Sequence, residues 1–382
     1  MLFLYLLLTL LLLSIMVIIH ELGHFLFAKL FKVTVLEFSV GMGPAIFTTG
    51  KKKNKDNGGI CLAESFTHDG ENKNEIQSAK KAEEFDGKTV FSIRALPIGG
   101  FVSMAGEDSA SDDVNAFCNK KVWQRLIITL AGPVMNLLLG FICVCVLVGI
   151  DGATDKLPSN TIVYTTEEIQ LSQTGETPLM SGDTIIKVNN VAVHTGNELE
   201  YEITNQGFEP VKLTVIRNGE KIVLDSVTFP VEEVQGVSMG RTDFYVFKEE
   251  KTTFGVIAKH AFFRSVSMVK MVVDSLVDLV SGRYGVDALS GPVGVSEVVG
   301  KMTKRGFYPL LYLFAFITIN LGVFNLIPFP ALDGGRTVFL AYEGIFRKPV
   351  KKEVEQFINT AGLMLLMGLA IFVMIKDIFA LF

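Results

Sequence analysis

Two histidines and a glutamate near the N-terminus have the spacing of a metal-dependent hydrolytic site. His20 and His24 are four residues apart, and Glu21 follows the first of them. Residues four apart lie on one face of an α-helix, so the two imidazoles can bind a single Zn²⁺ ion. The neighbouring carboxylate can then reach a water molecule on that ion and take its proton. The alternative is that both histidines are ordinary packing residues of an apolar helix.

The setting of these three residues favours the metal site. Residues 1–19 contain no charged side chain, so the motif ends a helix long enough to enter a membrane. Ionisable groups at membrane depth are costly and usually serve a function. The segment lacks the basic start and the small-residue cleavage site of a signal peptide. We therefore expect a first membrane span that continues to about Phe27.

The composition is that of a membrane protein with a soluble module attached. Of 382 residues, 49% are hydrophobic, and the net charge of −5 gives no reason to expect a nucleic-acid partner. The four cysteines show no CxxC or zinc-ribbon spacing, so neither a disulfide framework nor a cysteine metal site is indicated.

Four long uncharged segments predict four transmembrane helices, at 1–19, 126–150, 306–332 and 357–375. The short loop 333–356 is basic, which places it in the cytoplasm by the positive-inside rule. Both termini are then extracytoplasmic, loop 28–125 is cytoplasmic and segment 151–305 is extracytoplasmic. The histidines lie near the cytoplasmic end of the first span. The basic residues of the loop are Arg336, Arg347, Lys348, Lys351 and Lys352.

A third zinc ligand is expected after the third span. Catalytic zinc sites usually have three protein ligands and one open position. Asp333 is the best candidate, because the third span ends on the same side of the membrane as the histidines. Asn320 and Asn325 precede it, and Pro328, Pro330 and the Gly334–Gly335 pair break the backbone where it could line a cavity. The alternative is that Asp333 only caps a turn beside the membrane.

Between the first two spans, residues 89–108 indicate a β-hairpin that turns at Gly99 and Gly100. It could be a plain surface hairpin, but beside a metal site its edge could pair with an extended peptide. Segment 51–88 is polar and is assigned no chemistry. Asn136, in the small-residue motif of the second span, could pack between helices or brace Glu21.

Residues 151–253 change character to short strand-like runs with turns and one helical stretch. The segment Pro178–Val193 contains SGD, an alternating strand and an Asn-Asn turn, which resembles the core of a PDZ domain. A generic small β module is the alternative. Residues 255–281 have helical periodicity but too many charges to span, so we expect an amphipathic helix at the membrane surface.

Together these groups predict a zinc endopeptidase that cleaves membrane-spanning segments. Zinc on His20, His24 and Asp333 lowers the pKa of a bound water, and Glu21 moves its proton to the leaving amine. A helical substrate must unwind before attack. Gly99 and Gly100 could receive it as an added strand, and Asn320 and Asn325 could hold its freed backbone groups.

The chain resembles the site-2 protease family, peptidase family M50, and within it the regulator of sigma-E protease type. The matching segments are HELGH (20–24), FSVGMGP (38–44), LPIGGFVSMAGE (96–107), AGPVMN (131–136), LSGPVGV (289–295) and NLIPFPALDGG (325–335). The resemblance implies regulated intramembrane proteolysis in the bacterial inner membrane. The substrates would be single-span membrane proteins, such as anti-sigma factors or signal-peptide remnants, already trimmed by an upstream site-1 protease.

Two features depart from that resemblance. One PDZ-like module is indicated where the sigma-E proteases of Gram-negative bacteria carry two, and segment 51–88 is longer than usual. The carboxylate-binding loop of a PDZ domain is also not recognisable. In the family the module is thought to exclude large substrates.

The expected fold is therefore a multi-pass α-helical membrane protein with a cytoplasm-facing β-hairpin or sheet and an extracytoplasmic PDZ-like α+β domain. We expect the first two spans and region 28–125 in residues 1–150, and the PDZ-like domain in 151–253. An amphipathic helix and linker follow in 254–305, and the last two spans with the LDG motif in 306–382. Two functional alternatives stay open: a PDZ adaptor without catalysis, and a membrane metallohydrolase acting on lipidated substrates.

Overall fold

The structure is a computed structural model that describes residues 2–49, 88–107, 111–154, 157–163, 179–234, 237–248, 252–283 and 291–379. The predicted insertion 51–88 lies almost wholly outside the described residues. The chain divides into two compact units: residues 1–139, 290–305 and 320–382 form the first, and residues 140–289 and 306–319 the second. The domain boundaries expected from the sequence follow the roles of the segments and stay a prediction.

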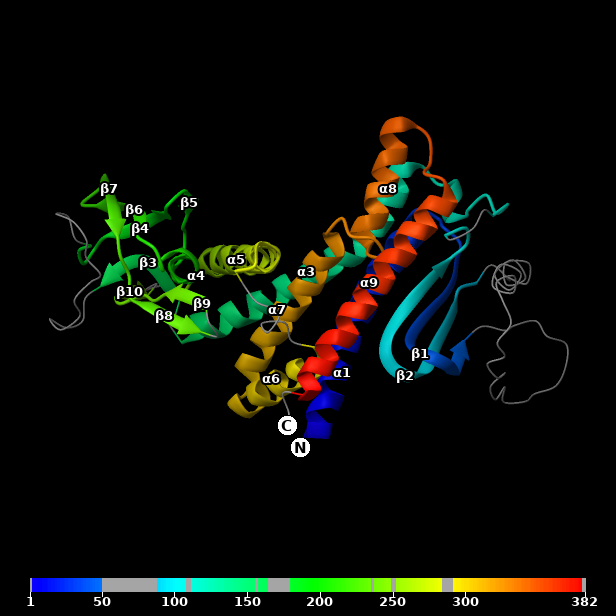
Figure 1. The fold of residues 1–382 in the computed structure, drawn as a ribbon, viewed down its shortest axis with the longest axis horizontal. Coiled ribbons are helices and arrows are strands. Elements are labelled where there is room, and N and C mark those ends of the chain that lie inside the picture. The colour runs from blue at the N-terminus through cyan, green and yellow to red at the C-terminus, as the bar shows by residue number, and fades with distance from the viewer. Residues whose placement is uncertain are drawn as a thin grey trace. The chain divides into compact units, whose positions relative to one another are not determined.

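In the part of the chain that the structure describes, four helices are long and apolar enough to cross a membrane, as the sequence predicts: α1 (Leu2–Leu30), α3 (Val122–Ala153), α7 (Phe307–Leu326) and α9 (Lys352–Phe379) (Figure 1). The few hydroxyls of α1 are satisfied within the helix, because Thr9 and Ser14 each donate to a carbonyl one turn earlier, at 2.8 Å. Pro133 does not end α3, which continues through it. The chain is therefore a multi-pass membrane protein.

The predicted hairpin at 89–108 proves to be part of a larger sheet. Strand β2 (Val90–Met104) pairs antiparallel with β1 (Val35–Thr49), and both lie beside α1 in Figure 1. Phe38 of β1 pairs with both Phe91 and Val102. The two limbs of β2 are therefore separated by β1 and do not pair with each other, which corrects the simple hairpin. A local turn pattern could not show that a distant strand inserts between the limbs.

Two segments expected to be connections are helices. The loop after the third span contains α8 (Asp333–Phe346), and the link after the amphipathic helix contains α6 (Pro292–Arg305). A carboxylate from another helix stabilises the start of α6, because Asp377 Oδ2 accepts from the backbone N–H groups of Gly291 and Gly294 at 2.9 and 2.8 Å. This cap comes from residues far along the chain, so local patterns do not predict it.

The second unit contains a β module. A six-stranded sheet has the order β10-β3-β4-β6-β7, with β5 paired to β4, and β8 and β9 form a separate pair. The strands are β3 (Pro158–Val163), β4 (Thr184–Val188), β5 (Val191–Ala192), β6 (Val211–Arg217), β7 (Glu220–Val227), β8 (Val231–Val234), β9 (Val237–Gly240) and β10 (Tyr245–Lys248). Its core includes Ile162, Ile185, Leu199, Ile203 and Leu213, all at most 1% exposed.

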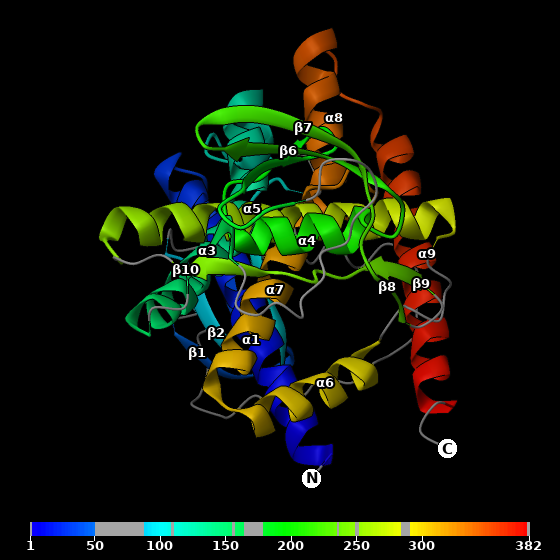
Figure 2. The same cartoon turned by 90° about the vertical axis from the view of Figure 1, so that its left-hand side faces the viewer.

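In chain order, helix α4 lies inside this β module and helix α5 follows it. Helix α4 (Gly196–Gln206) begins with a capping box between Thr195 and Glu198, and α5 (Phe254–Ser281) lies next to it (Figure 2). Tyr201 of α4 donates to Asp274 of α5 at 2.7 Å, and Lys270 pairs with Glu202. Helix α5 is therefore attached to the β module through its polar face.

The SGD motif supplies a buried ion pair to the module. The Asp183 side chain is fully buried and accepts two hydrogen bonds from Arg217, each 2.8 Å long. It also accepts from the backbone N–H of Met180 at 2.8 Å. A buried carboxylate with this many donors fixes the turn before β4 to the end of β6.

We expect Asp183→Ala to destabilise the β module by about 3–5 kcal/mol, because it leaves the Arg217 guanidinium buried without its counter-charge. Hydrogen exchange in the full chain, followed over residues 179–248, measures the effect as faster exchange of β4 and β6 amides. The matched control is Asp225→Ala, which removes an exposed pair with Lys212 and should change the stability by less than about 1 kcal/mol. Equal exchange in both variants would contradict the expectation.

Candidate active site

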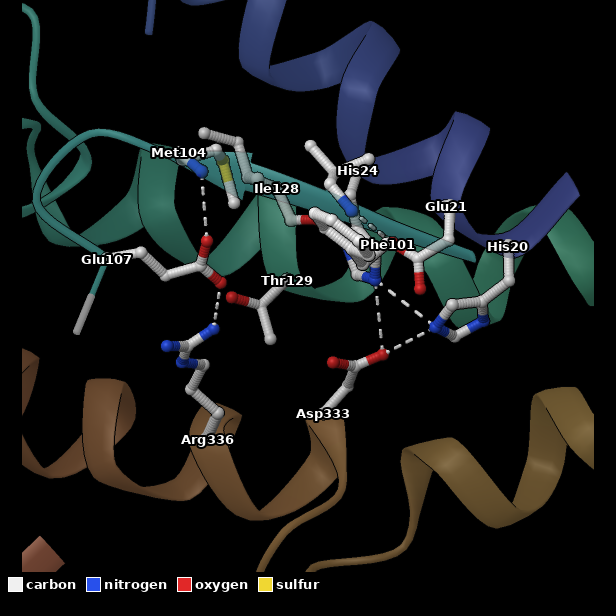
Figure 3. A pocket seen from close by; sticks show the side chains of 11 residues that line it. His20, Glu21, His24, Phe101, Met104, Glu107, Ile128, Thr129, Asp333 and Arg336 are labelled. Carbon is white, nitrogen blue, oxygen red and sulfur yellow. Dashed lines mark hydrogen bonds and ion pairs between the residues drawn. The ribbon is translucent and has the colours of Figure 1, made fainter. Parts of the chain in front are cut away.

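Three side chains from distant parts of the chain direct one donor atom each toward a common point (Figure 3). The Nε2 atoms of His20 and His24 lie 3.2 Å apart. Asp333 Oδ2 lies 2.9 Å from the first and 3.3 Å from the second. The first two residues come from α1, and the third is the first residue of α8.

This arrangement fits a zinc ion. Ligand atoms about 2.0–2.1 Å from a tetrahedral zinc lie about 3.3 Å from one another, close to the separations seen here. Within the described residues, Asp333 Oδ2 is buried without a hydrogen bond of good geometry, although both imidazoles are near it. Three donor atoms that face one another in this way need a cation between them.

Hydrogen bonds on the far side of each ring favour this orientation of the imidazoles. His24 Nδ1 lies 2.8 Å from the carbonyl oxygen of Ile128, so Nδ1 carries the proton and Nε2 the lone pair. Asn136, fully buried in α3, has its side-chain nitrogen 3.3 Å from His20 Nδ1, while its own oxygen has no hydrogen-bond partner among the described residues. Exchanging the two amide atoms lets that oxygen accept from Nδ1–H, which satisfies both groups and frees His20 Nε2.

Asp333 is held by a tight fold of the chain between α7 and α8. A side chain on Gly334 would lie 2.1 Å from the carbonyl oxygen of Ile327, so this glycine lets the start of α8 approach the segment after α7. It lies inside α8 and does not break the backbone as the sequence predicts. Asn359 of α9 accepts from the backbone N–H of Ala331 at 3.2 Å. Burial raises the pKa of Asp333, but the two imidazoles outweigh it and hold that pKa below its usual range. The carboxylate is thus ready to act as an anionic ligand.

Helices α1 and α3 approach closely at the site, at two glycines. A Cβ on Gly132 would lie 2.3 Å from His24 Nε2 and 2.7 Å from His20 Nε2. A Cβ on Gly23 would lie 2.4 Å from the carbonyl oxygen of Ala131. The sequence shows that small residues gather here, but not that Gly132 makes room for the imidazoles themselves.

Glu21 faces the sheet and completes a pocket of about 200 Å³ (Figure 3). Its Oε2 accepts from the backbone N–H of Val102 at 3.1 Å. The same pocket is lined by the three donor residues and by Phe101. The arrangement places a carboxylate base next to a metal position and next to backbone that can bind a peptide.

The other predicted residues differ in how close they lie to this pocket. A side chain on Gly100 would approach Glu21 Cγ to 3.9 Å, and Gly99 has the left-handed backbone (φ +75°) that favours glycine. Asn320 and Asn325 are half-buried in α7 and are not among the residues that line the pocket in the described part of the chain. Sequence reasoning missed Glu107 and Arg336, which do line it, although both lie in or beside conspicuous motifs.

The chain is similar to proteins that are named as zinc metalloproteases. Residues 8–58 and 77–369 match the profile described as Peptidase family M50. A Clostridium acetobutylicum protein, provisionally named a zinc metalloprotease, is 34% identical over 365 residues, covering 96% of this chain and 94% of that protein. The Bacillus subtilis regulator of sigma-W protease RasP is 27% identical over 451 residues, and the match covers 96% of each chain.

The chain therefore belongs to peptidase family M50. It is a zinc metalloprotease of the site-2 type and acts within the membrane that its four helices span. Zinc is its metal cofactor.

We expect Gly132→Ala to lower zinc affinity by about tenfold or more, because the added methyl occupies the space of the two imidazoles. Metal analysis of the purified protein after dialysis against a weak chelator measures the loss. Gly149→Ala in the same helix is the matched control, since a Cβ there meets nothing within 4 Å. If the Gly132 variant keeps as much zinc as the wild type, α1 and α3 can move apart without weakening the site.

Proposed function

We propose that this protease cleaves the transmembrane segments of single-span membrane proteins, of the anti-sigma-factor or signal-peptide-remnant type, after an upstream site-1 protease has trimmed them. The observation that carries the proposal is the convergence of His20, His24 and Asp333 beside both Glu21 and the outward edge of β2. A metal position alone would suit many hydrolases. An adjoining strand edge suits a substrate in extended form.

In this proposal His20, His24 and Asp333 hold the zinc and Glu21 is the general base. When bound, zinc would polarise the scissile carbonyl and lower the pKa of a water molecule, so that this water can lose a proton and attack the carbonyl. Glu21 takes the proton of that water and passes it to the leaving amine. Ile128 and Asn136 keep the two imidazoles turned toward the metal.

Substrate binding is proposed to use the end of β2. A transmembrane helix has all its carbonyls bonded internally, so part of it must unwind to be cleaved. Gly99 and Gly100, within β2, lead into the edge that could receive the unwound segment as an added strand. Asn320 and Asn325 lie in the last turns of α7, before the break at residues 327–332, and could hold freed backbone groups.

The β module is proposed to be a PDZ-like domain that excludes proteins with large extracytoplasmic parts. Its antiparallel sheet, with α4 beside it, supports that class of domain. The name of the Bacillus subtilis relative, regulator of sigma-W protease, supports substrates of the anti-sigma type. The lipid bilayer and the site-1 protease are the other proposed partners.

The proposed location is the bacterial inner membrane, with both termini extracytoplasmic and the active site facing the cytoplasm. The basic residues between α8 and α9 support this orientation, because short basic loops stay in the cytoplasm. They are Arg347, Lys348, Lys351 and Lys352.

We expect Glu21→Gln to lower the cleavage rate by about 10²-fold or more, because the amide cannot take the proton from the attacking water. Co-expression with a tagged single-span substrate measures the cleavage, and metal analysis confirms that zinc is still bound. Full cleavage by this variant would remove Glu21 from the mechanism. Failure of wild-type protein to cleave any peptide, with zinc bound, would favour the adaptor or the lipid-directed hydrolase.

Asn325→Ala is expected to raise the KM for a transmembrane substrate several-fold with zinc content intact, because one donor for unwound backbone is lost. The exposed neighbour Phe324 supplies the control, since Phe324→Leu changes the same turn of α7 without removing a polar group. Loss of zinc from the Asn325 variant would instead show that this residue supports the fold of the site.

A further inference from the structure

The outward edge of β2 is occupied by two carboxylates. Val102 N–H donates to Glu21 Oε2 at 3.1 Å, and Met104 N–H donates to Glu107 Oε2 at 3.2 Å. Alternate residues of an edge strand direct their backbone groups away from the sheet, so these are two successive positions at which an added strand would bond. Glu21 and Glu107 therefore occupy the donors that an extended substrate needs.

Glu107 is itself held in place from α8. Its other oxygen, Oε1, pairs with Arg336 Nη1, and Arg336 lies one turn after Asp333 (Figure 3). Both oxygens of the carboxylate are thus engaged, one by the strand edge and one by a guanidinium. The side chains of Arg336 and Glu107 are still 29% and 18% exposed, so separating them does not bury an unpaired charge.

This ion pair stands between two cavities. Glu107 and Arg336 line both the catalytic pocket and a second cavity of about 340 Å³. The second cavity has charged groups of both signs in its lining, including Arg125, Glu343, Lys352 and Glu355. Apolar side chains such as Phe339, Leu340 and Val350 also line it. The charged groups can pair with polar residues of a peptide, and an apolar span packed against them would take away their hydration.

We propose that the Glu107–Arg336 pair is a displaceable clasp, and that the second cavity receives the polar residues on one flank of the scissile bond. This inference rests on the proposed function. A substrate carbonyl takes the Met104 N–H from Glu107, and the released carboxylate swings away with the guanidinium. The passage between the cavities then opens. Arg336 and Glu107 act as specificity residues, because a substrate gains affinity from the second cavity only through polar residues beside its scissile bond.

The geometry sets which substrate residues reach this cavity. Residues paired with Val102 and Met104 lie two apart on the substrate, about 7 Å along the strand. The scissile bond lies at the level of Glu21 and Val102, and the second cavity begins beyond Glu107. We therefore expect the residues about three to six positions from the scissile bond, on one flank only, to enter it.

Cys118 offers a direct test, because it lines the second cavity. In a chain carrying Glu21→Gln to preserve the substrate, with the other cysteines replaced, Cys118 remains as the single thiol. Single-span substrates with one cysteine at successive positions on both flanks are then oxidised with the protein in membranes. Disulfide cross-links should form about three to six residues from the scissile bond on one flank, at least about fivefold above the other flank.

The same panel with Cys118→Ser supplies the background. Absence of cross-links from either flank, or equal cross-linking from both, would overturn the proposal. Each cysteine substrate is also tested for cleavage by protein with Glu21 intact. Cleavage without cross-linking therefore rejects only the second cavity, whereas absence of cleavage rejects the proposed function itself.

The Glu107–Arg336 clasp is tested separately by measuring the KM for a single-span substrate. Glu107→Gln and Arg336→Gln should each lower the KM by about two- to fivefold, because either change weakens one half-buried ion pair that competes with substrate. The double variant should gain no more than either single one. Glu297→Gln, which removes an exposed pair with Lys301 on α6, is the control and should leave KM unchanged. A raised or unchanged KM with zinc retained, or additive effects, would overturn the clasp.

Discussion

The site depends on direct contact between the backbones of α1 and α3. His20 and His24 project toward α3, and they fit there because Gly132 has no side chain and Gly23 lies against the carbonyl of Ala131. In a membrane there is little hydrophobic force between helices, so close packing of small residues has to hold them together. The same contact that joins the two helices therefore leaves the space that the two imidazoles occupy.

Polar groups in this part of the molecule are arranged in pairs, which lowers the cost of placing them among apolar helices. The Ile128 carbonyl and the Asn136 amide each face one imidazole nitrogen, and Asp333 faces the other nitrogen of both rings. Each pairing also selects a tautomer or a ring orientation. The same contacts therefore satisfy the buried polar groups and orient the metal ligands.

The sequence predicts those parts of the fold that depend on local pattern. The lengths of the apolar segments predict the four spans, and the helical period predicts that His20 and His24 share a face. The order of the spans predicts Asp333 as the third ligand, because it places that residue on the same side of the membrane as the histidines. The insertion of β1 between the limbs of β2, and the cap that Asp377 gives to α6, depend on residues far apart in the chain. The sequence shows that Gly334 has a flexible backbone, which predicts a break in the chain. It does not show that the Ile327 carbonyl approaches this glycine inside α8.

An intramembrane protease must offer backbone N–H donors to its substrate without leaving them unpaired before the substrate binds. An unsatisfied N–H in an apolar setting costs several kcal/mol, so an open strand edge is unstable until a strand arrives. At Val102 and Met104 that cost is avoided by carboxylates, which substitute for the missing carbonyls. In the proposed binding mode an extended peptide replaces Glu21 at Val102, so one hydrogen bond is exchanged for another and the carboxylate is released beside the metal position. Binding of an unwound segment and freeing of the base are in this way the same event.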